Sequence, residues 1–202
     1  MALSDLTFKL YTDSGLTTPY TGTSSLVHET DQSDNPQVIG PLYFGSTDSS
    51  AQLEATSNPG VDQITLTPTV GLSAWQASTA YSLGDRVIPV TPNGYVYEIT
   101  TAGTTDSGEP TWPTTLDQTV VDNTAVWNTE AATHALTEVE LSLDGAAYNS
   151  AGTALNLGTT LTGGSGNAIT VYIRVTNAVT SVTSNTNFED IIFNINEVQE
   201  TA

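Results

Sequence analysis

The sequence predicts an all-β protein: an immunoglobulin-like antiparallel β-sandwich with a small inserted module of three or four strands. Short stretches in which Val, Ile, Leu and Tyr alternate with Thr and Ser are separated by turn-forming residues, and no stretch keeps a helical period. All three tryptophans, Trp75, Trp112 and Trp127, fall within residues 73–130. The flanks on either side resemble each other in length and composition, and neither contains a tryptophan.

The chain is acidic, and this charge excludes several classes of partner. Its formal net charge is −19, and Lys9, Arg86 and Arg174 are its only lysine and arginine residues. Such a surface repels phosphate backbones and anionic lipid, so we expect no nucleic-acid binding and no membrane adhesion or insertion. The negative field can steer the chain to a basic partner, or it can simply be a solvated surface.

The absence of cysteine removes another set of functions. With no cysteine among the 202 residues, disulfides, thiol catalysis and thiolate metal sites are excluded. No stretch approaches the roughly 20 apolar residues of a membrane-spanning helix. The first residues show no basic region followed by an apolar one, so no secretory signal is expected. We expect no cofactor.

In the N-terminal flank, alternation predicts strands at residues 6–11, 25–29, 38–44 and 64–68. Pro41 lies inside the third of these and places it at a sheet edge or at a bulge. Residues 51–55 are too few to assign.

In the C-terminal flank, alternation predicts strands at residues 136–143, 168–176 and 188–198, with a weaker strand at 154–157. Leu136, Val139, Leu141 and Leu143 are expected to share one face of the first. The glycine-rich residues 158–167 are expected to form a flexible loop.

Neither flank has enough strong strands to close a core alone. We therefore predict that residues 1–72 and 131–202 fold together as one sandwich that anchors the protein, with residues 73–130 inserted between two of its strands. Three modules in a row are the alternative.

The inserted module is expected to contain strands at residues 86–89, 95–100 and 124–127. Gly84-Asp85 and Asn93-Gly94 are turn pairs that separate them. Because about 55 residues bury only a small core, a few large aromatic side chains must fill it. Trp75, at the start of the module, and Trp127, which alternates with Ala125, are expected to be core residues.

The order of residues in the module is similar to that of small chitin- and cellulose-binding modules, carbohydrate-binding families five and twelve. The similarity covers residues 74–130 and rests on an ordered set of positions: Trp75, Tyr81-x-x-Gly84-x-x-Val87, Gly94-Tyr95, Pro110 and the late Trp127. The resemblance implies a small β module that binds polysaccharide.

The flanks resemble tailed-bacteriophage structural virion proteins. The similar phrases are DNPQ at 34–37, LYFGS at 42–46, ATSNPGVDQITLTPT at 55–69 and VYIRVTNA at 171–178. This resemblance implies a viral protein of the virion, made in the host cytoplasm and released by lysis. Its implied partner is the major capsid protein or a tail lattice. We expect a symmetric homo-oligomer. A capsid decoration protein is favoured over the alternative of a tail or fibre protein.

A sugar site requires an exposed aromatic ring together with polar groups that bind hydroxyls. Trp112 lies in a loop between Pro110 and Pro113 and is the first candidate for contact with a host-surface polysaccharide. Tyr95 and Tyr97 share one face of a strand and, with Asn93, complete the candidate glycan-binding set. One face of that strand must be core, so a core role for the tyrosines stays open.

Catalysis is not expected. His28 and His134 match no metal-ligand spacing, and no G-x-S-x-G elbow is present. Glu98, Glu109 and Asp117 lie in the module, but a core of this size rarely holds an enzyme cleft. Two alternative functions remain: a carbohydrate-binding module of a secreted polysaccharide-degrading system, and an enzyme acting on cell-wall polymer.

Overall fold

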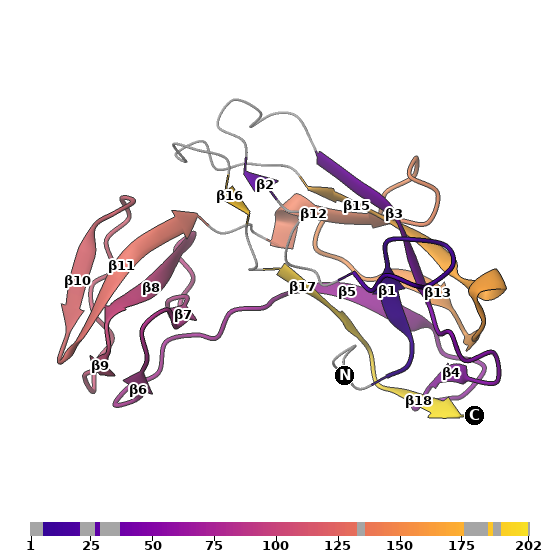
Figure 1. The fold of residues 1–202 in the computed structure, drawn as a ribbon, viewed down its shortest axis with the longest axis horizontal. Helices are drawn as coiled ribbons and strands as arrows, with labels where there is room; N and C mark the ends of the chain where they lie inside the picture. The colour runs from indigo at the N-terminus through magenta and orange to yellow at the C-terminus, as the bar shows by residue number, and fades with distance from the viewer. Residues whose placement is uncertain are drawn as a thin grey trace.

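The protein is almost entirely β-structure, as the sequence predicts. The computed structural model describes residues 6–20, 27–28, 37–132, 136–175, 186–187 and 191–201. Every pairing between two named strands in these residues is antiparallel. The helical elements in these residues are two short 3₁₀ turns, η2 (Leu136–Glu138) and η3 (Ser165–Asn167). The described chain is therefore an all-β, sandwich-like fold (Figure 1).

One four-stranded sheet and two three-stranded sheets build the sandwich. The first has the order β1-β3-β15-β12, made of β1 (Lys9–Tyr11), β3 (Gln37–Gly45), β15 (Ile169–Val175) and β12 (Val139–Ser142). The second has the order β13-β5-β17, made of β13 (Leu155–Gly158), β5 (Ile64–Val70) and β17 (Ile191–Ile195). The third has the order β14-β4-β18, made of β14 (Thr160–Thr162), β4 (Gln52–Ala55) and β18 (Val198–Thr201).

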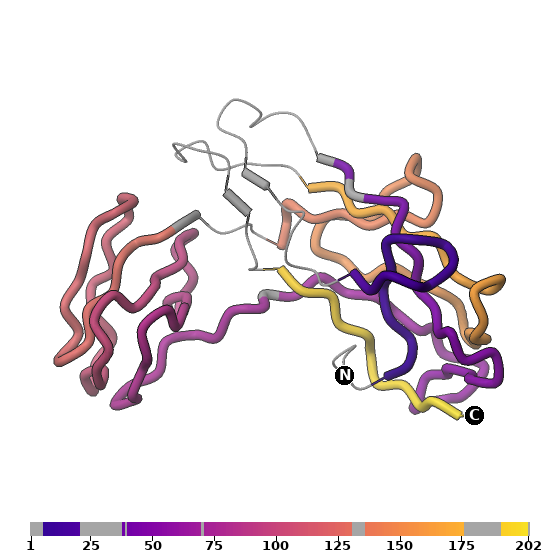
Figure 2. Tube along the Cα trace, in the orientation of Figure 1, coloured from indigo at the N-terminus to yellow at the C-terminus, as the bar shows by residue number. Residues whose placement is uncertain are grey.

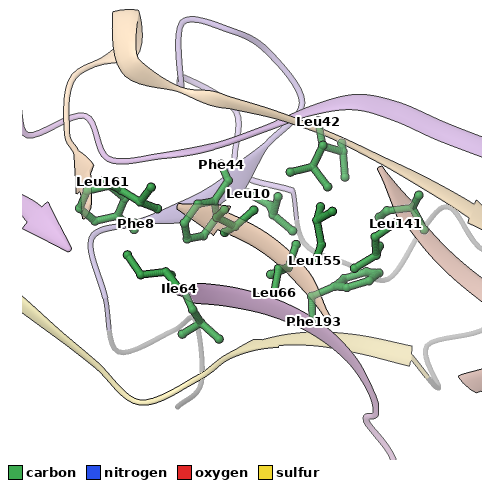
Figure 3. Close-up of a cluster of buried hydrophobic side chains, with 14 of the residues drawn as sticks. Phe8, Leu10, Leu42, Phe44, Ile64, Leu66, Leu141, Leu155, Leu161 and Phe193 are labelled. Carbon is green, nitrogen blue, oxygen red and sulfur yellow. The ribbon is translucent and has the colours of Figure 1, made fainter. Parts of the chain in front are cut away.

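The sandwich core is mainly aliphatic, with three phenylalanines among its members, and draws on all of these sheets. Figure 3 shows side chains from opposite strands meeting in one cluster, among them Leu42, Leu66, Leu141 and Phe193. In β15, Val171, Ile173 and Val175 are buried, and β17 buries Ile191, Phe193 and Ile195. Because side chains alternate between the faces of a strand, this is the burial pattern expected of the alternating sequence in both segments.

Strands from before and after residues 73–130 pair with each other throughout the sandwich. β3 pairs with β15, β5 with both β13 and β17, and β4 with both β14 and β18. In Figure 2 the indigo and purple tube accordingly interleaves with the orange and yellow tube. The two ends also meet, because the Thr7 backbone N–H and hydroxyl both donate to the Glu200 carboxylate. The short strands β2 (Val27–His28) and β16 (Thr186–Asn187) also pair one strand from before residues 73–130 with one from after them.

Pro41 lies at a bulge in β3, outside the stretch from Tyr43 to Gly45 that pairs with β1. β3 lies between β1 and β15 in its sheet, and its register with β15 shifts between Val171 and Ile173. Proline has no N–H to donate to the strand ladder, so an irregular register is where it fits inside a sheet.

The expectation of a flexible loop at 158–167 is wrong. This segment contains β14, which pairs with β4 and buries Leu161, followed by η3. The Gly163 N–H donates to the Ala51 carbonyl at 2.7 Å, and the Gly164 N–H donates to the Ser46 carbonyl at 2.8 Å. A Cβ at Gly163 would clash with the Asp48 carbonyl oxygen, so the close approach of the turn before β4 requires glycine here.

The expectation of one strand over 136–143 is also wrong at both ends. Leu136 lies in η2, and β12 begins only at Val139. β12 ends at Ser142, whose hydroxyl donates to Asp144 and accepts the Gly145 N–H. Val139 and Leu141 are buried as predicted, but Leu143 lies within this turn, one residue past the end of β12, and is 44% exposed.

Residues 73–130 form two small sheets of their own. The larger has the order β10-β11-β8-β7, made of β10 (Thr119–Asp122), β11 (Ala125–Ala132), β8 (Tyr95–Thr101) and β7 (Arg86–Val87). The smaller pairs β6 (Ala80–Tyr81) with β9 (Gly103–Thr104). Gly84 and Gly94, in the predicted turns, have positive φ angles of 85° and 88°.

Candidate ligand-binding site

The module has a hydrophobic core that shares no residue with the sandwich core. Its buried members are Trp75, Val87, Tyr97, Ile99, Ala125 and Trp127, with Tyr81, Tyr95, Trp112 and Val120 packed against them and half-buried. Trp75 is 5% exposed and Trp127 is fully buried, so both are core residues as expected. Large aromatic rings therefore fill this small core.

A buried carboxylate holds the two core tryptophans together. Asp122 Oδ2 accepts the indole N–H of Trp75 at 2.8 Å and that of Trp127 at 3.1 Å. Its other oxygen accepts the backbone N–H of Asp106 at 2.8 Å. Asp122 is 2% exposed, so burial removes its hydrogen bonds to water. The three donors replace those hydrogen bonds and offset the cost of burying a carboxylate. The sequence gives no sign of this role for Asp122, because only the fold brings it near both tryptophans.

Trp112 lies at the boundary between this core and solvent. Its ring packs on Tyr97 with centroids 4.2 Å apart, and its centroid is 5.9 Å from that of Trp127. The side chain is half-buried, so part of the indole faces solvent. Its N–H donates to Glu109 Oε1 at 2.8 Å. Trp112 is thus a ring held in place by the core, with an exposed portion that a ligand can contact.

Glu109 fixes the loop that carries Trp112. The same Oε1 atom accepts the indole N–H of Trp112 and the backbone N–H of Val90, both at 2.8 Å. This carboxylate therefore ties the 105–113 segment to the chain before β8. From the sequence, Glu109 is one of several carboxylates in the module, because its spacing to Trp112 carries no distinctive signal.

Tyr97 does not offer its ring to a ligand, which corrects its place in the predicted glycan-binding set. It is fully buried, and its hydroxyl donates to the Pro113 carbonyl at 2.6 Å. Burial raises the pKa of this phenol above its usual value, partly opposed by the hydrogen bond from Asn93. The alternation of β8 turns this face of the strand to the core, which was the alternative left open.

Asn93 has a structural use for both ends of its amide. Its Nδ2 donates to the Tyr97 hydroxyl at 2.7 Å, and its Oδ1 accepts the Tyr95 backbone N–H at 3.1 Å. Asn93 therefore closes the turn at Gly94 and supports Tyr97, which in turn supports Trp112. Tyr95 is half-buried against the module core. Of the four predicted residues, Trp112 and Tyr95 are half-buried against the module core, Tyr97 is core, and Asn93 is a turn residue.

The cationic residues of the described chain have few free roles. Arg86 Nε lies 2.6 Å from Glu130 Oε2 in the module, and Arg174 Nε lies 2.6 Å from Glu140 Oε2 in the sandwich. Arg174 also lies 4.0 Å above the Tyr148 ring. Two of the three fixed cations are thus paired with carboxylates.

The residues that the structure describes contain no group of three His, Cys, Asp or Glu side chains arranged to hold a metal ion. His134 and the side chain of His28 lie outside those residues. No helix within the described ranges is long and apolar enough to cross a membrane. Comparisons with family models, curated proteins and solved structures found no match to the chain.

Proposed function

We propose that this protein is a structural, non-enzymatic component of a tailed-phage virion. In this proposal it is a capsid decoration protein whose sandwich, built from residues 1–72 and 131–202, binds the particle as a symmetric homo-oligomer. The inserted residues 73–130 are displayed outward, and Trp112 holds host-surface glycans. Each contact is weak, and many copies on one particle supply avidity.

The observation that carries the proposal is the separation of the two cores. The aliphatic cluster of the sandwich and the aromatic cluster of the module have no residue in common. Each part can therefore keep its shape while its own surface contacts a different partner. The phrases in the flanks that resemble virion proteins support particle attachment, and the Tyr81-x-x-Gly84-x-x-Val87 pattern supports polysaccharide contact.

The acidic charge supports the choice of partner for the sandwich. A net charge of −19, with two of the three fixed cations already paired, favours a lattice surface rich in lysine and arginine. Such complementarity raises the rate of encounter and weakens as salt is added.

Electron cryo-microscopy of particles that contain this chain tests the attachment. The expected map shows a β-sandwich on the capsid lattice with a protruding domain. Density on the tail would move the protein to the tail or fibre class. A soluble chain absent from every particle would overturn the proposal and favour a carbohydrate-binding module of a secreted system, the class that the module pattern resembles.

Adsorption to polysaccharide tests the module. Trp112→Ala should reduce retention on insoluble chitin or cellulose by about tenfold, since stacking of a sugar on an indole is a main source of such binding. Val121→Ala is the matched control, because Val121 is an apolar side chain of the same module that is 69% exposed. Equal retention of both variants and the unaltered chain would show that the module is purely architectural.

A further inference from the structure

The charge around Trp112 narrows the class of glycan that this site can take, and this inference rests on the proposed function. From the indole, its carboxylate neighbour and the net charge, we infer that the site prefers glycans with free amino groups, such as polymers of glucosamine, over their N-acetylated or acidic counterparts. At neutral pH many of these amines are ammonium ions.

One oxygen of the Glu109 carboxylate is hydrogen-bonded and the other is open to a ligand. Its Oε1 is occupied by the Trp112 and Val90 N–H groups. Its Oε2 has no partner among the described residues and belongs to an exposed side chain. Since Oε1 accepts the indole N–H at 2.8 Å, the charge that the two oxygens share lies at the edge of the Trp112 ring. The site therefore presents a hydrogen-bond acceptor with negative charge next to an aromatic ring.

An aromatic ring beside a carboxylate favours a cationic ligand. A cation is attracted to the face of an indole, and a carboxylate strengthens this by a charge-assisted hydrogen bond. The indole N–H, which could bind an anionic or carbonyl oxygen, is already used by Glu109. The groups offered at Trp112 thus suit an ammonium donor better than an acetamide or a carboxylate.

The charge around the site disfavours acidic glycans. Arg86 is the only lysine or arginine of residues 73–130, and it is paired with Glu130. No fixed cation of the module is therefore left to receive a uronic acid or a phosphate group. The net charge of −19 further raises the local concentration of a polycation and repels polyanions.

The experiment compares soluble oligomers of glucosamine with N-acetylglucosamine oligomers of the same length, using isothermal titration calorimetry on the full chain. The key variant is Glu109→Gln, which keeps an oxygen to accept from Trp112 and Val90 but removes the charge. Glu54→Gln is the control, because it makes the same charge change in β4 of the sandwich, where Glu54 accepts the Thr160 hydroxyl.

We expect the unaltered chain to bind the amine-bearing oligomer at least threefold more tightly than the acetylated one. Glu109→Gln should remove this preference, about a three- to tenfold effect for an exposed ammonium site, while Glu54→Gln should leave it intact. Trp112→Phe should weaken both ligands while keeping an aromatic ring against the core.

Three outcomes would overturn the inference, and they differ in what they say about the proposed function. Equal binding of both oligomers, with Glu109→Gln unchanged, leaves glycan binding standing and removes the amine preference. If Glu54→Gln and Glu109→Gln lose the same affinity for the amine-bearing oligomer, and polylysine binds comparably, the preference is bulk attraction of a polycation. Binding of neither oligomer by any form would remove the glycan role of the module as well.

Discussion

The sandwich and the inserted module solve the same problem, burial of enough apolar surface, in different ways. The sandwich spreads its core over many small aliphatic contributions from strands far apart in the sequence. The module concentrates its core in a few aromatic rings and ties two of them to one carboxylate, Asp122. Truncation of one leucine should therefore lower the stability of the sandwich, whereas truncation of one polar residue, Asp122, should unfold the module.

One property of the chain makes this comparison measurable. All three tryptophans lie in the module, so tryptophan fluorescence reports on the module alone. Far-ultraviolet circular dichroism reports on both parts, most of whose strands are in the sandwich. Urea unfolding followed by the two signals separates the stability of one part from that of the other.

The largest effect is expected from Asp122→Ala. Two buried indole N–H groups and the Asp106 N–H would lose their acceptor, at a cost of about 4 kcal/mol in free energy of unfolding. This is enough to unfold a small domain, so the fluorescence transition should be lost while the dichroism transition remains. Asp106→Ala removes the same charge from an exposed residue and should change neither midpoint by much. A folded Asp122→Ala module would show that Asp122 does not hold the core.

The next effect is expected in the sandwich, from Leu66→Ala. Leu66 is fully buried at the centre of β5, between β13 and β17. Such a truncation costs about 2–5 kcal/mol. The dichroism midpoint should fall and the fluorescence midpoint should stay. Ile192→Ala, on the neighbouring strand but 43% exposed, is the control. Equal shifts of both signals would mean that the two parts unfold as one unit.

A smaller effect is expected from Tyr97→Phe, which removes the hydroxyl that links Asn93 to Pro113. The loss should be about 1–2 kcal/mol and should appear in the fluorescence midpoint. Tyr95→Phe is the control, since its hydroxyl has no partner within the described chain.

Tyr97 and Tyr81 make the module sensitive to base. Burial raises the pKa of Tyr97 and of Tyr81, so the unfolded chain loses these protons at lower pH than the folded one. Stability from this source is present below a pH of about 10, the unfolded value, and falls as pH rises through the folded pKa values. Urea midpoints by fluorescence should decline over that range, less steeply in Tyr97→Phe. A pH-independent midpoint would contradict this.

The smallest effects concern the two arginine pairs. Arg86→Lys should cost about 0.5 kcal/mol or less, because the Arg86–Glu130 pair is partly exposed. Arg174→Lys should cost about 1 kcal/mol, because Arg174 also lies over the Tyr148 ring. Added salt should reduce both differences. A larger loss for Arg86→Lys would show that the module depends more on its ion pair than the sandwich does.

Local pattern determined much of this protein. Alternation identified β15 and β17 and the faces they bury, because a strand places every second side chain on one side. Gly84 and Gly94 marked turns because they adopt positive φ angles at little steric cost. The clustering of tryptophan predicted an aromatic core, in which Trp75 and Trp127 are now found.

Tertiary structure alone decided the rest. The glycine-rich 158–167 segment pairs with β4, because partners more than one hundred residues away supply its hydrogen bonds. Asp122 bonds two indoles that lie five and forty-seven residues from it, which no local spacing indicates. Trp112 and Tyr97 were both candidates for ligand contact, yet Tyr97 is fully buried and Trp112 is half-buried at the edge of the core. Which ring is exposed depends on what packs against it, and that is fixed only when the distant strands meet.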